Sequence, residues 1–278
     1  MGIGAGSCSG IAAMDKLEEG YLERFSGIAR VYGEQQLLAL SQAHFAVAGI
    51  GGVGSWAAEA LARSGVGNIT LIDPDKISLS NVNRQIHALS STVDEIKTEV
   101  MAQRIKEINP QCKVTCISDW LNEDTARNYL GGHLDGLIDA TDSVKQKSAL
   151  LYFCKRNKLL VIATGGAGGL IDPLKITTAD VSRTHNDPLI AKVRSTLRSQ
   201  YGFTRNPARR FGIECVYSSE QPRFPAVDGS ITMQKPGVKG LSLDCYSGYG
   251  AAPVVTSVFG MIAVSRLFDR YLKKPQSS

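Results

Sequence analysis

A glycine-rich stretch between an apolar run and a helical pattern is the first feature of the sequence that could do chemistry. It reads GIGGVG over residues 49–54, and Gly49, Gly51 and Gly54 have the GxGxxG spacing. Backbone N–H groups in such a turn, together with the positive end of the following helix, can receive phosphate. Asp73 follows about twenty residues further on, where a carboxylate can accept hydrogen bonds from ribose hydroxyls. The pattern predicts a nucleotide site, with a tight turn that binds no ligand as the alternative.

Three charged residues further along the chain bear on which nucleotide is bound. GxGxxG followed by an acidic residue is most often a NAD site, and a helix end alone can hold the pyrophosphate of a dinucleotide. A triphosphate attacked at its α-phosphorus also needs cations for the developing charge and a carboxylate for Mg²⁺. Arg84 and Lys97 could supply the cations and Asp142 the carboxylate. Each has a structural alternative: a surface cation for Arg84, a solvated helix residue for Lys97, and the N-cap of a helix beginning at Ser143 for Asp142.

These residues follow apolar runs in an alternating pattern of strands and helices. After a helical N-terminal arm over residues 17–42, broken at Gly33, the pattern predicts strands over residues 44–50, 68–73, 113–118, 134–139 and 159–164. Helices are predicted over residues 53–63, 94–108, 124–130 and 143–157. The order predicts an α/β fold with a Rossmann-like, doubly wound, mainly parallel sheet, whose ligands bind at the carboxyl ends of the strands. Beyond Gly169 the alternation is lost, and one strand over residues 174–178 and a loop-rich region are expected.

Length and composition indicate one large globular domain. The chain has 278 residues, of which 43% are hydrophobic and 21% charged, with a net charge of +5. We expect a flexible tail over residues 1–13 and a single domain over residues 14–278. Within that domain we expect a nucleotide-binding core over residues 14–164 and a C-terminal elaboration over residues 165–278. The elaboration contains a basic insertion at residues 183–210 and an apolar helix at residues 250–272.

Six scattered cysteines, without a CxxC pair or a signal peptide, favour a reduced, cytoplasmic protein. No charged residue occurs between Cys245 and Ser265, which raises the question of a membrane span. The glycines, the proline and the hydroxyl residues in that stretch favour a buried helix instead.

Four motifs together resemble those of a known enzyme family. They are GIGGVG at 49–54, LIDPDKISLSNVNRQ at 71–85, Lys97, and IDATDS at 138–143. In type, order and spacing they are similar to the ATP-dependent adenylating enzymes related to ubiquitin-activating E1 proteins and to the bacterial MoeB and ThiF proteins. The resemblance implies an E1-like (ThiF) fold that uses ATP and Mg²⁺.

The resemblance also implies roles for individual residues. Asp142 would bind the magnesium ion, and Arg84, Lys97 and Asp142 would be the catalytic residues. In that family an arginine of the partner subunit's N-terminal arm reaches the γ-phosphate, which implies a homodimer in which Arg24 or Arg30 takes this role. The implied nucleotide-binding set is Gly49, Gly51, Gly52, Gly54, Asp73, Asn81, Asn83, Arg84, Lys97, Ala140, Thr141, Asp142 and Ser143.

Four further stretches resemble one branch of this family, the tRNA threonylcarbamoyladenosine dehydratases. They are RFSGIARVYGEQ at 24–35, TGGAGGLIDP at 164–173, ECVYSSEQPRFP at 214–225 and DCYSGYGAA at 244–252. Enzymes of that branch use ATP to activate the threonyl carboxylate of N6-threonylcarbamoyladenosine at position 37 of certain tRNAs. The carbamoyl group of the same side chain then displaces AMP and closes a ring, with net loss of water. Because nucleophile and electrophile belong to one side chain, no thioester cysteine is strictly required.

The resemblance suggests a tRNA partner for the basic segment at residues 183–210, whose cations could contact phosphates. Tyr201 and Phe203 within it would either stack on anticodon-loop bases or anchor the segment to the core. Cys215 and Cys245 are candidate nucleophiles, although buried structural thiols are the commoner outcome.

Other functions remain open from the sequence. Adenylation of the C-terminal glycine of a ubiquitin-like sulfur carrier is one, although the two CxxC pairs of many MoeB-like and ThiF-like proteins are missing. The others are an NAD-dependent oxidoreductase and a non-catalytic nucleotide-responsive scaffold. A sulfur-transfer partner protein is a further expectation that the sequence does not decide.

Overall fold

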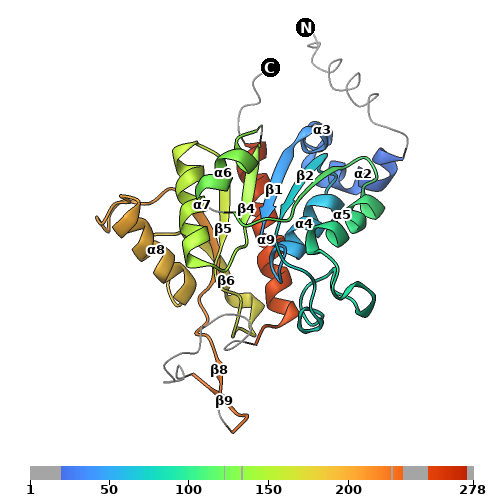
Figure 1. Ribbon diagram of the computed structural model, residues 1–278. Helices are drawn as coiled ribbons and strands as arrows, with labels where there is room; N and C mark the ends of the chain where they lie inside the picture. The colour runs from blue at the N-terminus through green and yellow to red at the C-terminus, as the bar shows by residue number, and fades with distance from the viewer. Residues whose placement is uncertain (1–19, 122, 133, 227, 234–249, 274–278) are drawn as a thin grey trace.

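A seven-stranded sheet forms the centre of the molecule (Figure 1). The structure is a computed structural model and describes residues 20–121, 123–132, 134–226, 228–233 and 250–273. The strand order is β3-β2-β1-β4-β5-β7-β6, and only β6 runs antiparallel to its neighbour. The predicted doubly wound, mainly parallel sheet is therefore confirmed. The strands are β1 His44–Ala48, β2 Asn68–Ile72, β3 Lys113–Ile117, β4 Gly136–Asp139, β5 Val161–Thr164, β6 Ile176–Asp180 and β7 Glu214–Ser218.

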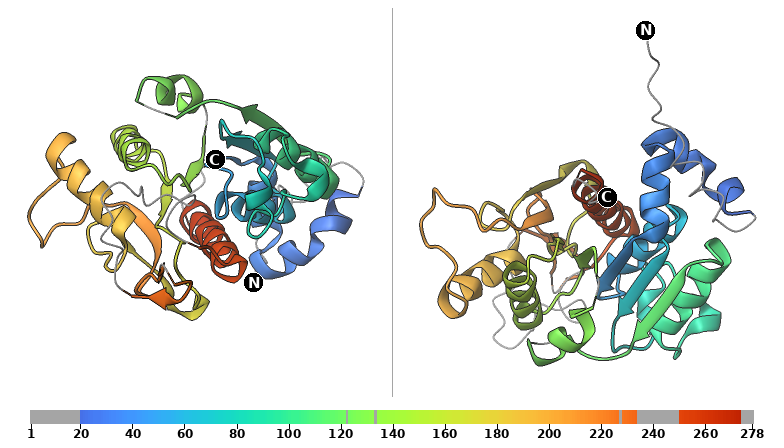
Figure 2. Two further views of the ribbon diagram at one scale, coloured as in Figure 1. Left: turned by 60° about the horizontal axis from the view of Figure 1, so that its bottom comes forward. Right: turned by 90° about the horizontal axis from the view of Figure 1, so that it is seen from above.

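Helices cover both faces of the sheet, which is why its central strands are buried and mainly apolar (Figure 2). In β1, Phe45 and Val47 pack into one core with α4, α5 and α9, whereas Ala46 and Ala48 pack into the other with α6, α7 and α8. The helices are α2 Tyr21–Tyr32, α3 Glu34–Gln42, α4 Gly54–Arg63, α5 Lys97–Ile108, α6 Glu123–Leu130, α7 Val144–Arg156, α8 Pro188–Gln200 and α9 Pro253–Leu272. Short elements are the 3₁₀ turns η1 Leu79–Asn81, η2 Ser90–Thr92 and η3 Pro173–Lys175, and the hairpin strands β8 Phe224–Pro225 and β9 Ile231–Thr232.

The chain leaves β1 toward β2 on one side and later returns to β4 on the other side. The connections therefore diverge between β1 and β4, and a crevice opens at the carboxyl ends of these two strands. Both the glycine turn after β1 and the IDATDS motif after β4 begin there. The topology thus brings together the motifs that the sequence separates by about ninety residues.

The segment at residues 183–210 is not the loop-rich insertion that was expected. It contains α8, which begins at Pro188 with Asp187 as its N-cap and packs its apolar face on α7. β7 was also missed, although it lies inside the sheet between β5 and β6. The strand expected at 174–178 is β6, two residues later. The residues beyond 165 therefore complete the same sheet, while the division of the domain at that point stays a prediction.

The apolar C-terminal segment forms α9, a helix buried against α4 and the sheet. Among the described residues, no helix has the length and apolar character needed to cross a membrane. The expected tail at residues 1–13 and the thiol of Cys245 lie outside the described residues.

Candidate functional site

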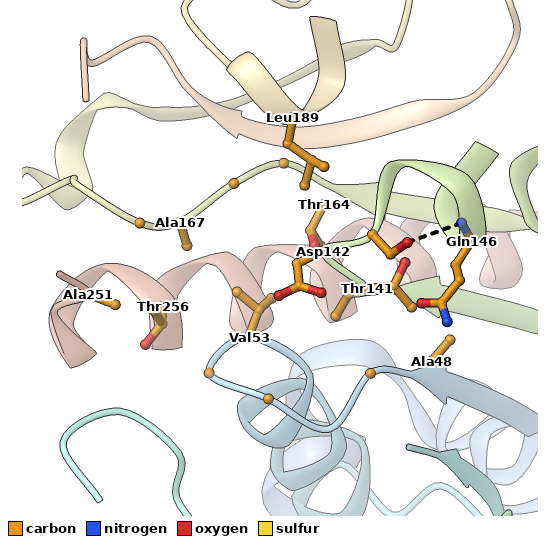
Figure 3. Close-up of a pocket in the computed structure, with 18 of the residues that line it drawn as sticks. Ala48, Val53, Thr141, Asp142, Gln146, Thr164, Ala167, Leu189, Ala251 and Thr256 are labelled. Carbon is orange, nitrogen blue, oxygen red and sulfur yellow. Dashed lines mark hydrogen bonds between the residues drawn. The ribbon is translucent and has the colours of Figure 1, made fainter. Parts of the chain in front are cut away.

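A cavity of about 700 Å³ lies at the carboxyl ends of β1, β4 and β5 (Figure 3). Most of the nucleotide-binding set expected from the sequence contributes to its wall. Gly54 and Asn83 do not line it. The expected residues that do are Gly49, Gly51, Gly52, Asp73, Asn81, Arg84, Lys97, Ala140, Thr141, Asp142 and Ser143.

The glycine turn depends on backbone contacts that a side chain would prevent. Gly49 has φ +83°, and a Cβ there would lie 2.8 Å from the carbonyl oxygen of Ala140. A Cβ at Gly54 would lie only 1.7 Å from the carbonyl oxygen of Gly49. Gly54 therefore lets α4 begin directly against the turn, so that its N-terminus points to the cavity.

Asp73 holds the glycine turn from the neighbouring strand. Its Oδ2 accepts a hydrogen bond from the Ile50 N–H at 2.6 Å, and its Oδ1 accepts one from the Asp75 N–H at 2.9 Å. Burial raises the pKa of the Asp73 carboxyl, and the cation of Lys97 opposes this shift. Asp73 thus braces the turn, whereas its contact with ribose stays a prediction.

Lys97 is a buried residue of the site and not a solvated helix residue. It is 6% exposed and is the first residue of α5, because the chain is still extended at Ile96. Its Nζ lies 2.8 Å from Asp75 Oδ2 and 3.7 Å from Asp73 Oδ1. The ammonium is therefore held at the cavity wall, and α5 begins three residues later than expected.

Arg84 lies against the glycine turn. A Cβ at Gly52 would be 3.3 Å from the Cγ and Cδ atoms of Arg84, so the aliphatic part of the arginine fills the space that this glycine leaves. Its Nη1 donates to the Ser80 carbonyl oxygen at 2.8 Å and to Asn83 Oδ1 at 2.9 Å. These contacts direct the guanidinium along the rim of the cavity and leave donors for a phosphate.

The structure assigns the cap of α7 to Ser143, whose Oγ accepts from the Gln146 N–H at 3.4 Å. The alternative that Asp142 is this N-cap is therefore wrong. Asp142 is exposed, and its carboxylate points into the cavity (Figure 3). The Asp142 side chain is available for a ligand because Ser143 accepts the hydrogen bond from the first turn of α7.

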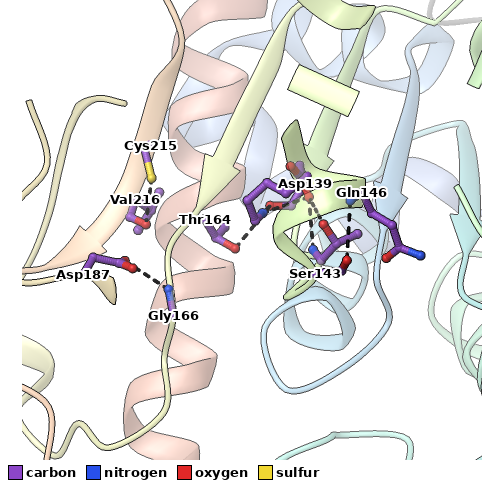
Figure 4. Close-up of polar contacts among 10 residues, drawn as sticks. Asp139, Ser143, Gln146, Thr164, Gly166, Asp187, Cys215 and Val216 are labelled. Carbon is purple, nitrogen blue, oxygen red and sulfur yellow. Dashed lines mark hydrogen bonds and ion pairs between the residues drawn. The ribbon is translucent and has the colours of Figure 1, made fainter. Parts of the chain in front are cut away.

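A buried ion pair fixes the turn that carries Asp142. Lys147 Nζ lies 2.9 Å from Asp139 Oδ1, and both side chains are 0% exposed (Figure 4). The same Oδ1 accepts from the N–H of Thr141 at 3.1 Å and from its hydroxyl at 2.7 Å. Neither charged residue was expected at the site from the sequence, although Asp139 belongs to the IDATDS motif.

Asp187 plays a similar part at the other end of the cavity. Its Oδ2 accepts from the Gly166 N–H at 3.0 Å (Figure 4), and its Oδ1 accepts from the Ile190 N–H at 2.9 Å. It thereby joins the glycine-rich turn after β5 to the start of α8, and burial raises the pKa of its carboxyl. The pair Asp187-Pro188 is an N-cap followed by proline at the first helical position, a signal that could have predicted α8.

The side chains around the cavity fit a magnesium ion that arrives with a nucleotide. Within the described part of the chain, no group of three or more His, Cys, Asp or Glu residues could hold a metal ion by itself. Mg²⁺ is usually bound by one or two carboxylates together with phosphate oxygens and water. The exposed carboxylate of Asp142 suits that mode of binding and not an all-protein metal site. Asp75 is also exposed at the cavity wall, but its carboxylate is paired with Lys97.

Of the two candidate nucleophiles, Cys215 lies among the described residues, and its thiol is a poor nucleophile. Cys215, the second residue of β7, is 0% exposed, and burial raises its pKa well above the ordinary thiol value. Its Sγ donates to the Val216 carbonyl oxygen at 3.5 Å. Arg24 and Arg30 are both exposed on α2, and neither lines the cavity of its own chain.

The basic segment divides into structural and exposed cations. Arg194 Nη1 donates to the carbonyl oxygens of Val181 and Thr184 at 3.1 and 3.0 Å, which fixes it to the core. The ring of Tyr201 packs on Tyr152, and that of Phe203 packs on Phe211, so both aromatic residues anchor the segment. The exposed cations are Arg183, Lys192, Arg205, Arg209 and Arg210.

Comparison with known proteins gives consistent matches over most of the chain. The ThiF family model matches residues 24–274. The tRNA threonylcarbamoyladenosine dehydratase of Haemophilus influenzae is 48% identical over 265 residues, which cover 95% of this chain and 99% of that protein. The Escherichia coli dehydratase is 46% identical over 259 residues, or 93% and 97% of the two chains. A crystal structure of the E. coli dehydratase TcdA in complex with ATP superposes with a TM-score of 0.82, at 44% identity, covering 92% of this chain and 97% of that one.

Proposed function

The chain belongs to the ThiF family and, within it, to the tRNA threonylcarbamoyladenosine dehydratases, and from this membership we propose that it modifies tRNA with ATP. The substrate is the threonyl carboxylate of N6-threonylcarbamoyladenosine in tRNA, and the product is the cyclic form of that side chain. The ATP complex of the E. coli relative supports ATP as the nucleotide. Like its relatives, the protein is a tRNA-modifying enzyme.

The reaction proceeds in two steps that balance. A carboxylate oxygen attacks the α-phosphorus of ATP, and pyrophosphate leaves with the electrons of the broken P–O bond. The carbamoyl group then attacks the acyl carbon and loses a proton, and AMP leaves with the electrons of the C–O bond. The net change is loss of water from the side chain, with ATP converted to AMP and pyrophosphate.

The cavity provides for the first step in three ways. The N–H groups of the glycine turn and the start of α4 bind phosphate. Arg84 and Lys97, held at the rim and wall, stabilise the negative charge that develops during the attack. Asp142 holds Mg²⁺, which when bound neutralises phosphate charge. The convergence of these groups from three separate loops on one cavity is the observation that carries the proposal.

The second half of the cavity receives the tRNA side chain. Gly165, Gly166 and Lys192 line this part. Of the other exposed cations of residues 183–210, Arg183 precedes α8, and Arg205, Arg209 and Arg210 follow its C-terminal end. Lys192 at the cavity and the exposed cations before and after α8 suit the phosphates of an anticodon stem-loop. We also propose a homodimer, in which Arg24 or Arg30 of the exposed α2 face reaches the partner's nucleotide. A cytoplasmic location follows from the tRNA substrate and from the free cysteines.

The test is nucleoside mass spectrometry of tRNA incubated with the protein, ATP and Mg²⁺. We expect conversion of threonylcarbamoyladenosine to a product lighter by one water, with one AMP and one pyrophosphate formed per product. tRNA without the threonylcarbamoyl group is the matched control and should yield neither. Unchanged modified nucleoside, together with ATP–pyrophosphate exchange on a carrier protein ending in Gly-Gly, would replace this function with sulfur-carrier adenylation.

A further inference from the structure

Two helices, α4 and α9, begin side by side at the nucleotide cavity. Thr256 of α9 lies beside Gly52, since a Cβ on that glycine would be 3.4 Å from Thr256 Cγ2. One turn further on, a Cβ on Gly260 would be 2.7 Å from the carbonyl oxygen of Val53. The two helices therefore run in the same direction, packed closely because Gly260 has no side chain.

Parallel packing places two positive helix ends next to each other. Like ends repel, so this arrangement favours an anion that both ends can share. α9 has 20 residues, and no side chain caps its N-terminus. The glycine turn accounts for the end of α4, whereas the end of α9 has no role in the phosphate site described so far.

A buried hydroxyl marks the same place. Thr256 is 2% exposed and lines the cavity, yet its Oγ1 has no hydrogen-bond partner among the described residues. The next residue, Ser257, satisfies its own hydroxyl by donating to the Pro253 carbonyl oxygen at 2.6 Å. An unpaired buried hydroxyl is unfavourable, and most buried polar groups in folded proteins have a hydrogen-bond partner.

The segment that leads into α9 is fastened on both sides. Asn83 Nδ2 donates to the Ala251 carbonyl oxygen at 2.9 Å, and the Gly169 N–H donates to the Gly250 carbonyl oxygen at 2.7 Å. Asn83 also accepts from Arg84, so one asparagine connects the catalytic arginine to the start of α9. This accounts for Asn83 as a positioning residue, since it does not line the cavity itself.

We infer that the start of α9, with the hydroxyl of Thr256, binds the terminal phosphates of ATP and then the pyrophosphate that leaves. The inference rests on the proposed ATP-dependent function. In Figure 3 Ala48 and Thr256 lie at opposite ends of the nucleotide part of the cavity, with Asp142 between them. With Asp73 in its proposed contact with ribose, the nucleoside would lie near the end of β1, and the triphosphate would extend past the glycine turn toward Arg84 and Thr256.

The decisive experiment compares nucleotide binding to the wild type and to Thr256→Val by titration calorimetry in Mg²⁺, without tRNA. The probes are ATP, AMP and inorganic pyrophosphate. The lost hydrogen bond to a charged phosphate should weaken binding of ATP and pyrophosphate about tenfold or more, while AMP binds within about twofold of the wild type. Thr256→Ser should restore ATP binding, and Ser257→Ala is the matched control that changes none of the three.

Thermal unfolding without nucleotide separates this role from a structural one. Valine removes an unpaired hydroxyl and keeps the shape, so Thr256→Val should melt at the same temperature as the wild type or higher. Unchanged ATP binding would overturn the inference, as would an equal loss of AMP binding or a lowered melting temperature. Because no tRNA is present, a failure of the tRNA reaction leaves these readings unaffected and is seen separately.

Discussion

Removal of the buried cation Lys147 should destabilise the protein strongly. The side chains of Lys147 and Asp139 are both 0% exposed, and Lys147 Nζ also donates to the Asp139 carbonyl oxygen at 3.0 Å. Within the described residues, Asp139 Oδ2 has no hydrogen-bond partner, and Lys147 is the one cation paired with this carboxylate. Lys147→Met keeps the length of the side chain and leaves the negative charge buried and unpaired.

The expected loss is about 3–5 kcal/mol of unfolding free energy, the usual cost of breaking a buried pair on one side. For a domain of this size that corresponds to a fall in melting temperature of roughly 10 °C. The double variant Lys147→Met/Asp139→Asn removes the charge as well and should recover at least half of the loss, because burying a neutral amide costs less than burying a carboxylate.

Urea and thermal unfolding of the wild type, the single variant and the double variant measure both quantities. The reasoning fails if Lys147→Met costs less than about 1 kcal/mol, a value typical of exposed pairs. It also fails if the double variant is less stable than the single one, since the buried charge would then not be the cause.

Three other perturbations give distinct outcomes. Asp142→Asn should lower the rate of pyrophosphate release about a hundredfold or more. The melting temperature should stay unchanged because Ser143, and not Asp142, caps α7. A lowered melting temperature would mean that the aspartate has a structural role. Arg209→Ala should raise the KM for tRNA and reduce the salt dependence of that KM, with kcat unchanged. Arg194→Ala loses contacts to two carbonyl oxygens and should mainly reduce stability. The same effect from both variants would contradict the division of the basic segment into structural and exposed cations. Burial, with nearby cations, lowers the pKa of His87 to about 4. Below pH 6.5 the unfolded chain therefore takes up a proton that the folded chain does not, and the free energy of unfolding should fall by about 3 kcal/mol between pH 6.5 and 4. His87→Gln should abolish this part of the pH dependence of stability.

Much of the nucleotide-binding half could be predicted because its signals are local. Apolar runs predict buried parallel strands, and the glycine spacing predicts the phosphate turn, since both depend on neighbouring residues. The same reasoning failed beyond Gly169. β7 and α8 are each stabilised by contacts with distant elements, α7 and the sheet, that local periodicity does not report. The Asp187-Pro188 pair, an N-cap followed by proline at the first helical position, is a local signal that predicts the start of α8.

The sequence by itself determined the fold class, the glycine turn and the motifs that identify the family, because spacing within a motif is a property of the chain alone. The tertiary structure decided which charged and polar residues are buried. Lys97 became part of the cavity wall, Lys147 became the partner of Asp139, and the capping of α7 by Ser143 left Asp142 for a ligand. It also placed Thr256 beside Gly52, about two hundred residues earlier in the chain. Burial and long-range contact depend on how the strands are ordered and the helices packed, so they exist only once the chain has folded.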